Sequence, residues 1–172
     1  MNQTVINVRG ANGTGKSHFV RSQLGPQAEW QVSAKADGPQ LRYTVGASRR
    51  VAAVGLYHNA CGGADGFKDA EHIVYTIGFL LGRGYEQVWF EGMAVSSSYQ
   101  RYADLDDNLR IAGIDFLWLF LRAPYEVAHA RIMQRNGGKP IKEEHLVKKY
   151  ASVEVTRAKA IRAGRWVYDF TY

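Results

Sequence analysis

The sequence predicts an α/β fold in which helices cover both faces of a central parallel sheet of about five strands. Two observations lead to this prediction. Short apolar segments alternate with segments of helical period along the 172 residues, which is typical of strands joined by crossover helices. A glycine-rich segment, Gly10–Ser17, also separates the first apolar segment from the first helical one. The length suits a single domain, residues 1–172, and parallel sheets bind ligands beyond the carboxyl ends of their strands.

The predicted strands are short and rich in β-branched and aromatic residues, and the turn Gly46-Ala47-Ser48 separates two of them. We expect strands over Val5–Val8, Arg42–Val45, Val51–Tyr57, Gln87–Phe90, Phe116–Leu121 and Trp166–Tyr168. The segments Gln23–Gln40 and Val95–Asn108 carry no pattern that identifies a motif.

The predicted helices follow these strands and end at glycines or asparagine. We expect helices starting near Lys16, over Asp69–Leu81 with apolar residues at helical spacing, over Ser96–Ala112, from Pro124 to the Asn136-Gly137-Gly138 break, and over Glu143–Ala163.

Composition narrows the class of protein. The net charge is +6, and residues 131–165 hold ten Lys or Arg and three Glu, so the positive excess lies near the C-terminus. Such a segment indicates either a surface for a polyanion or a solvated helix face.

Cys61 is the only cysteine, which excludes an internal disulfide and a cysteine-based zinc site. No apolar run is long enough to cross a bilayer. We therefore expect a soluble protein of a reducing cytoplasm, without a membrane partner.

A phosphate-binding motif follows the first predicted strand. Gly10-Ala11-Asn12-Gly13-Thr14-Gly15-Lys16-Ser17 matches the P-loop (Walker A) pattern G-x-x-x-x-G-K-[ST] at every fixed position. The glycines allow a ring of backbone N–H donors, and the helix that follows directs its positive dipole end at the same anion. Lys16 is expected to contact the β- and γ-phosphates, and the Ser17 hydroxyl to contact Mg²⁺. The segment from Gly10 to His18 therefore predicts binding of a nucleoside triphosphate, ATP in our interpretation, together with Mg²⁺.

Two carboxylates are candidates for chemistry at this phosphate site. Glu91 ends an apolar strand where P-loop enzymes commonly place an Asp near Mg²⁺, so we expect it to contact the metal or a metal-bound water. The alternative is an exposed loop residue. Asp65 lies in the loop after the Val51–Tyr57 strand and is our first candidate for the base that accepts a proton from an acceptor hydroxyl, with Glu91 second. The alternative for Asp65 is a cap on the helix that follows.

Basic and aromatic residues complete the predicted site. Arg131 and Arg135 are four apart on one helix face and can place two guanidinium groups over transferring phosphates, unless they are ordinary surface arginines. Tyr57, His58, Tyr99 and Tyr102 are candidates for stacking on a ring, although aromatic residues at helical spacing are more often core. For Cys61 we prefer plain packing.

Three segments together resemble bacteriophage 5-hydroxymethyluracil DNA kinases: Ile6–Arg21, Val54–Asp65 with Cys-Gly-Gly-Ala-Asp, and Arg131–Lys139 with Arg-Asn-Gly-Gly-Lys. The resemblance implies a P-loop kinase-type three-layer α/β/α fold with a helical lid over about residues 131–142. It also implies ATP-dependent phosphorylation of the hydroxymethyl group of 5-hydroxymethyluracil in DNA, which prepares the base for hypermodification.

Two other functions fit the same residues. The first is a small-molecule kinase for a nucleoside, a nucleotide or an antibiotic, which the P-loop and the lid would serve equally. The second is a DNA-binding accessory that hydrolyses ATP without an organic acceptor. The basic C-terminal third favours a DNA substrate over a small acceptor, because Lys and Arg that neutralise phosphates release counterions. The short chain argues against a motor.

Overall fold

The computed structural model describes residues 2–33, 40–58, 62–139 and 141–171. Its strands are β1 (Thr4–Arg9), β2 (Glu29–Ser33), β3 (Leu41–Val45), β4 (Val51–Val54), β5 (Gln87–Glu91), β6 (Asp115–Arg122) and β7 (Val167–Thr171). Its helices are α1 (Lys16–Leu24), the 3₁₀ turn η1 (Ala64–Gly66), α2 (Ala70–Gly82), α3 (Met93–Ser97), α4 (Gln100–Ile111), α5 (Tyr125–Arg135) and α6 (Glu143–Arg162).

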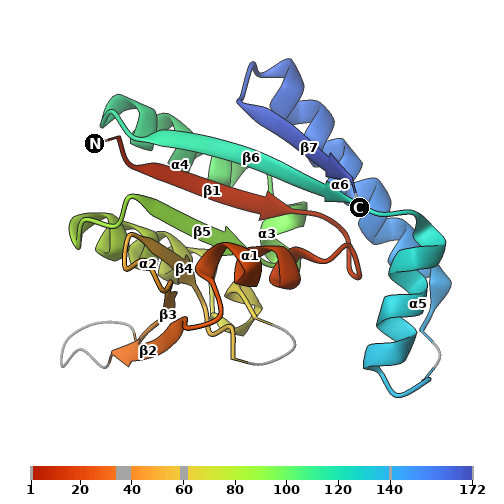
Figure 1. Ribbon diagram of the computed structural model, residues 1–172. Coiled ribbons are helices and arrows are strands. Elements are labelled where there is room, and N and C mark those ends of the chain that lie inside the picture. Colours follow the sequence, from red (N-terminus) through yellow and green to blue (C-terminus); the bar gives the residue numbers. More distant parts are fainter. Residues whose placement is uncertain (1, 34–39, 59–61, 140, 172) are drawn as a thin grey trace.

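Within the described residues, seven strands form one sheet in the order β2-β3-β4-β5-β1-β6-β7 (Figure 1). The strands β4, β5, β1, β6 and β7 are parallel, which confirms the predicted parallel sheet of about five strands. The strands β3 and β2 extend the sheet in antiparallel pairing. The sequence-based prediction missed β2, which lies in the segment Gln23–Gln40 where no motif was identified.

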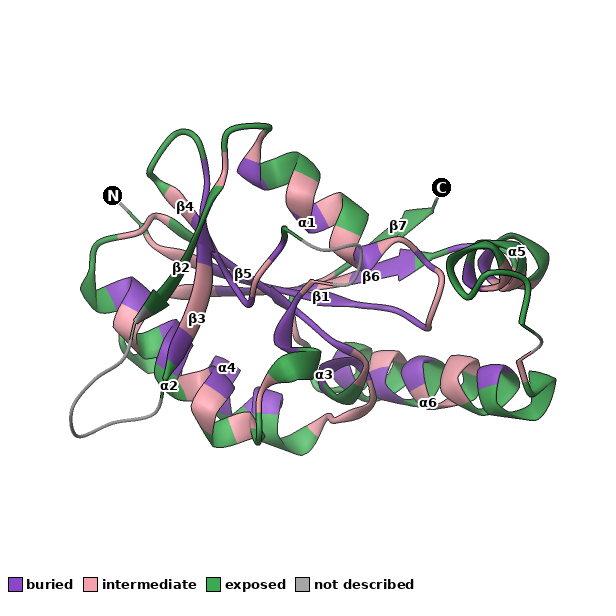
Figure 2. Ribbon diagram, turned by 90° about the horizontal axis from the view of Figure 1, so that it is seen from below, coloured by how far each residue is buried: buried purple, intermediate pink, exposed green. Residues whose placement is uncertain are grey.

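The layers follow from the alternation of side chains along the strands. Val5, Val88 and Phe90 belong to the apolar core on one face of the sheet, whereas Ile6 and Trp89 belong to the core on the other. The helices α2, α3, α4 and α6 cover the first face, and α1 covers the second (Figure 2). This is the predicted three-layer α/β/α arrangement. The α5 helix lies beyond the carboxyl ends of the strands (Figure 1).

Several boundaries differ from the prediction, and the last strand, expected over Trp166–Tyr168, runs from Val167 to Thr171. The helix expected over Ser96–Ala112 is two helices, because Ser98 has extended backbone angles between α3 and α4. Pro124 precedes α5 as its cap residue instead of forming its first turn. The strand expected to reach Tyr57 ends at Val54. In the part of the chain that the structure describes, no helix combines the length and apolar character needed to cross a bilayer.

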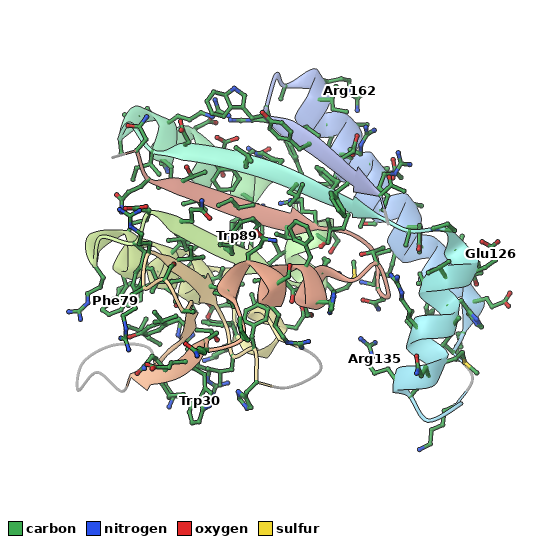
Figure 3. All side chains as sticks on the ribbon, in the orientation of Figure 1. Trp30, Phe79, Trp89, Glu126, Arg135 and Arg162 are labelled. Atoms are coloured by element: carbon green, nitrogen blue, oxygen red, sulfur yellow. The ribbon has the colours of Figure 1, made fainter. Side chains whose placement is uncertain are left out.

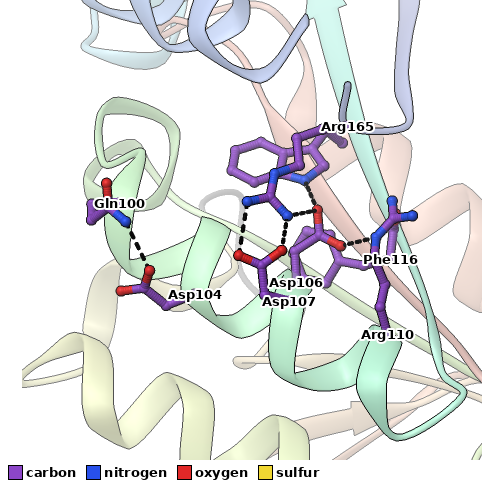
Figure 4. A network of polar contacts seen from close by, with 8 residues as sticks. Gln100, Asp104, Asp106, Asp107, Arg110, Phe116 and Arg165 are labelled. Carbon is purple, nitrogen blue, oxygen red and sulfur yellow. Dashed lines mark hydrogen bonds and ion pairs between the residues drawn. The ribbon is translucent and has the colours of Figure 1, made fainter. Parts of the chain in front are cut away.

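A buried carboxylate ties the second half of the chain together. Asp106 of α4 is fully buried and accepts a hydrogen bond from the indole Nε1 of Trp118 in β6 at 2.7 Å. It also pairs with Arg110, and with Arg165 at 3.5 Å, at the connection between α6 and β7 (Figure 4). The Arg110 guanidinium in turn lies 4.6 Å from the centre of the Trp166 ring. One carboxylate therefore fixes α4, β6 and the end of α6 relative to each other.

Asp106→Ala is expected to lower the free energy of unfolding by about 3 kcal/mol, because it leaves Arg110 and a buried indole N–H without their carboxylate acceptor, while Arg165 keeps only Asp107. Denaturant unfolding measures this loss. Asp104→Ala is the matched control on the same helix, because its exposed carboxylate contacts the Gln100 amide, and we expect a change within about 0.5 kcal/mol. Equal stability of the two variants would contradict the role given to Asp106.

Candidate functional site

The predicted phosphate loop connects β1 to α1 at the carboxyl edge of the sheet. No side chain caps the N-terminus of α1, whose cap residue is Gly15, so the first backbone N–H groups of this helix remain available to an anion. Gly13 has a φ of 80°, and a Cβ atom there would lie 2.4 Å from the carbonyl oxygen of Ala128 in α5. Glycine at this position therefore lets the loop approach the helix that carries the predicted lid arginines.

Lys16 is buried and folds back over its own loop. Its Nζ donates to the carbonyl oxygens of Gly10 at 2.9 Å and Ala11 at 3.1 Å. Burial lowers the pKa of Lys16, while the negative charges of Glu91 and Asp65 act in the opposite direction. The ammonium group thus contacts uncharged carbonyls in a site where an anion would stabilise its charge.

Glu91 is buried at the end of β5, which excludes the alternative of an exposed loop residue. Its Oε1 accepts a hydrogen bond from the Ser17 hydroxyl at 2.8 Å. Burial raises the pKa of Glu91, against the lowering effects of Lys16 and of the Ser17 hydrogen bond. β1 and β5 are parallel neighbours with Val8 opposite Glu91, so their carboxyl ends bring the loop and this carboxylate together.

Asp65 lies in the η1 turn and faces the same site. Its Oδ1 accepts the backbone N–H of Met93 at 2.7 Å, at the start of α3. The proposed alternative of a cap on the following helix is wrong, because Asp69 caps α2 by accepting the N–H of His72 at 2.8 Å. The Met93 contact instead anchors Asp65 next to the end of β5.

The two arginines of α5 reach the loop from the other side. The Arg131 Nη1 donates to the carbonyl oxygen of Gly13 at 3.3 Å. Arg135 extends from α5 toward the body of the protein (Figure 3), and its positive charge contributes to the lowered pKa of Lys16. Both arginines are exposed, and both line the cavity at the loop.

These side chains line one cavity of about 200 Å³. Of the predicted residues it contains Asn12, Gly13, Gly15, Lys16, Ser17, His18, Asp65, Glu91, Arg131 and Arg135. Gly10 is buried behind the loop, and Ala11 and Thr14 line a smaller hollow of about 70 Å³ next to β6 and α6.

Oxygen and nitrogen donors in this cavity fit the predicted ligands. The described residues contain no group of three or more His, Cys, Asp or Glu side chains that could hold a metal by themselves. Ser17 and Glu91 supply oxygen atoms at 2.8 Å from each other, and Mg²⁺ commonly binds one or two protein carboxylates together with the phosphates of a nucleotide. The residues therefore fit a magnesium ion that arrives with its nucleotide.

Sequence reasoning missed several residues of this region. Arg21 lines the cavity, and its Nε donates to the carbonyl oxygen of Tyr57 at 3.0 Å. Its position four residues after Ser17, on the same face of α1, was an available signal. Ser96 accepts the Gly10 N–H at 3.2 Å and so fixes the start of the loop. No sequence pattern distinguishes that serine from its neighbours.

The predicted stacking residues separate into two groups. Tyr102 is buried, with its ring centre 5.4 Å from that of Phe90, and Tyr99 packs at 5.6 Å from Trp118. Tyr102 belongs to the core and Tyr99 packs against it, so the expectation that these two rings stack on a base is wrong. Tyr57 belongs to the core on the face that α1 covers, and together with His58 it lines a cavity beside α1. Cys61 lies outside the described residues.

In the comparison with known proteins, the matching family model and the similar proteins carry the same description. Residues 2–162 match the family model described as 5-hmdU DNA kinase, where 5-hmdU is 5-hydroxymethyldeoxyuridine. The 5-hmdU DNA kinase of Pseudomonas phage M6 is 32% identical over 95% of this chain and 89% of its own length. That of Delftia phage PhiW-14 is 25% identical over 94% of this chain and 66% of its own, and that of Bacillus phage SP10 is 30% identical over 96% and 26%. The chain therefore spans most of the first relative but only part of the other two.

Gly63 provides a test of how tightly the site is packed. Its φ is 90°, and a Cβ atom there would lie 2.3 Å from Glu91 Oε1. Gly63→Ala is expected to lower the free energy of unfolding by roughly 1–3 kcal/mol, as measured by denaturant unfolding. Gly78→Ala is the matched control, because Gly78 is exposed in α2 and has no atom within 4 Å of the added methyl group. We expect that variant to gain about 0.5–1 kcal/mol, and a Gly63→Ala protein as stable as the control would contradict this packing.

Proposed function

The chain belongs to the 5-hmdU DNA kinase family, and from this premise we propose that it transfers the γ-phosphate of ATP to the hydroxymethyl group of 5-hydroxymethyluracil in DNA. The observation that carries the proposal is the single cavity in which Lys16, Ser17, Asp65, Glu91 and the two α5 arginines converge. A phosphate-binding loop, two carboxylates and two guanidinium groups are the parts that phosphoryl transfer requires.

In this proposal the loop from Gly10 to His18 binds the triphosphate. Lys16 exchanges the carbonyl oxygens of Gly10 and Ala11 for phosphate oxygens, which relieves the burial of its charge. Ser17 and Glu91 would hold the magnesium ion, which would supply positive charge to the phosphate oxygens. The backbone N–H groups at the start of α1 bind the same oxygens.

The transfer itself forms one bond and breaks another. The hydroxymethyl oxygen attacks the γ-phosphorus while the bond from this phosphorus to the bridging oxygen of the β-phosphate breaks, and ADP leaves. The proton of the hydroxyl passes to a carboxylate, and we assign this role to Asp65. Glu91 is buried and accepts a hydrogen bond from the Ser17 hydroxyl, which we assign to the metal, whereas Asp65 is exposed in the cavity and therefore accessible to an acceptor hydroxyl.

The α5 arginines stabilise the charge that develops during transfer. Arg131 and Arg135 are one helical turn apart, and both line the cavity opposite the two carboxylates. Guanidinium groups offset the charge on the equatorial oxygens of a transferring phosphoryl group. The segment 131–142 then serves as the lid, and the whole chain 1–172 acts as one kinase domain.

Fewer basic side chains are available to bind DNA than the ten Lys and Arg of residues 131–165 suggest. Arg157 pairs with Asp169, Arg165 pairs with Asp106 and Asp107, and Lys148 pairs with Glu144. Lys139 and Lys142 in the lid segment are exposed and have no ion pair within the described part of the chain. The same is true of Lys159 and Arg162, but these lie at the opposite end of α6, away from the lid. We propose that the two lid lysines contact DNA phosphates.

The direct test is incubation with ATP labelled on its γ-phosphate and separate acceptors. We expect label in DNA that contains 5-hydroxymethyluracil, and none in thymine DNA or in the Lys16→Ala protein, since this variant removes the phosphate contact and keeps the core. Phosphorylation of free 5-hydroxymethyldeoxyuridine as fast as of the same base in DNA would replace the proposal by the nucleoside-kinase alternative. ATP hydrolysis without labelling of any acceptor would replace it by the ATPase alternative.

The two carboxylates are expected to respond differently to removal of charge. Asp65→Asn keeps the shape of the side chain and its contact with Met93 but removes the proton acceptor, so kcat should fall by about 10²-fold or more with little change in ATP affinity. Glu91→Gln should weaken the binding of Mg²⁺ with ATP as well as kcat. Single-turnover rates and equilibrium ATP titration separate the two effects. An active Asp65→Asn protein beside an inactive Glu91→Gln protein would reverse the assignment.

A further inference from the structure

A second cavity of about 490 Å³ lies beside the phosphate cavity, between α1 and the β2–β3 edge of the sheet. Both cavities are lined by His18 and Arg21, so they adjoin each other along the first two turns of α1. Its volume falls within the range of small-molecule sites in proteins. Trp30, Tyr57 and His58 give it aromatic walls, and Trp30 projects from β2 at the edge of the sheet (Figure 3).

The local fold holds these aromatic residues in place. Trp30 pairs with Thr44 across the antiparallel β2–β3 ladder, so both side chains lie on the same face of the sheet. The Thr44 hydroxyl donates to the carbonyl oxygen of Gly55 at 2.9 Å and accepts the N–H of Tyr57 at 3.2 Å. Arg21 of α1 donates to the carbonyl oxygen of Tyr57 at 3.0 Å. The Tyr57-His58 segment is thereby fixed beside Trp30.

Trp30 has the features of a stacking surface. Its side chain is 54% exposed although it is large and apolar, and its ring centre lies 5.3 Å from that of His58. Trp30 belongs to neither of the two buried core clusters, so core packing does not explain its position. Nucleic-acid-binding proteins use such aromatic faces to stack bases, because every base has a π face.

Tyr57 separates this cavity from the phosphate cavity. A Cβ atom on Gly62, which lines the phosphate cavity, would lie 2.5 Å from Cδ1 of the Tyr57 ring. The Tyr57 hydroxyl is buried and has no hydrogen-bond partner within the described residues. Burial raises the pKa of Tyr57 well above its ordinary value, and the charges of Glu91 and Asp65 raise it further. The phenol is therefore a neutral polar group near both carboxylates, at the boundary between the two cavities.

We propose that this second cavity takes the pyrimidine base that carries the hydroxymethyl group, stacked on Trp30 and directed past Tyr57 toward the γ-phosphate. The inference rests on the proposed function, because it assigns the acceptor side of the same reaction. The geometry supports an extrahelical base: a base within a duplex cannot enter a cavity, so the nucleotide leaves the stack or comes from a single strand. Trp30, which lines the cavity, belongs to edge strand β2, and a DNA strand can lie alongside this edge of the sheet.

Trp30→Ala is expected to raise the KM for 5-hydroxymethyluracil DNA by about tenfold or more, the usual effect of removing a base-stacking side chain, and to leave the KM for ATP unchanged. Trp30→Phe, which retains an aromatic face, should restore most of the affinity. Trp166→Ala is the matched control, because Trp166 is 46% exposed and lies next to β7 at the opposite edge of the sheet. Melting temperatures of all three variants establish that they are folded.

A binding measurement without ATP separates the cavity from the chemistry. Fluorescence anisotropy with a labelled single-stranded oligonucleotide containing one 5-hydroxymethyluracil should show the same order of affinities: wild type and Trp166→Ala strongest, Trp30→Ala weakest. If the wild-type protein labels no acceptor, the proposed function fails. If it does label DNA while Trp30→Ala keeps the wild-type KM and DNA affinity, the cavity assignment alone is overturned. A rise in the KM for ATP instead of DNA would also overturn it, since the cavity would then hold adenine.

Discussion

The burial of two opposite charges, Lys16 and Glu91, is the constraint on which the rest of the site depends. Neighbouring parallel strands end at the same edge, so β1 and β5 bring the loop that begins α1 against the carboxylate that ends β5. Burial disfavours both charges, as the lowered pKa of Lys16 and the raised pKa of Glu91 show. Loop carbonyls and the Ser17 hydroxyl offset this cost in part. In the proposed function, a bound triphosphate with its metal would complete the compensation, and such perturbed groups are typical of functional sites.

The surrounding structure holds this cluster through hydrogen bonds between side chains and backbone and through close approaches at glycines. Gly13 brings α5 close to the loop, Gly63 packs against Glu91, and Ser96 fixes the start of the loop through the N–H of Gly10. Arg9, buried at the end of β1, donates to the carbonyl oxygens of Ser96 and Ser98, and burial lowers its pKa to about 9. The second half of the chain is stabilised by a separate network around Asp106. The basic charge that the sequence concentrates near the C-terminus therefore serves partly to build the fold and only partly to face solvent.

Sequence patterns predicted the parallel sheet, the phosphate loop and the position of Glu91, because apolar strands and glycine spacing are local signals. The β2 strand was missed although polar and apolar residues alternate along Glu29–Ser33, because the alternation covers only five residues at the edge of the sheet. The break at Ser98 escaped because α3 and α4 are both serine- or polar-rich and no proline or glycine separates them. Asp65 and its hydrogen-bond partner Met93 are 28 residues apart in the sequence. Trp30 can be identified as a candidate for base stacking only when the pairing of β2 with β3 is known. Long-range pairing was the information that local patterns lacked.

The two cavities meet at the first turns of α1, and this arrangement is the centre of the account: phosphate donor on one side, acceptor base on the other. A crystal structure with an unreactive ATP analogue, Mg²⁺ and a short single-stranded oligonucleotide containing 5-hydroxymethyluracil tests it most directly. The account predicts a triphosphate along Gly10–Ser17 with Lys16 released from the Gly10 and Ala11 carbonyl oxygens, and a pyrimidine against Trp30 with its hydroxymethyl group toward the γ-phosphate. A triphosphate bound elsewhere, or a base bound away from the cavity that Trp30 and Tyr57 line, would contradict it.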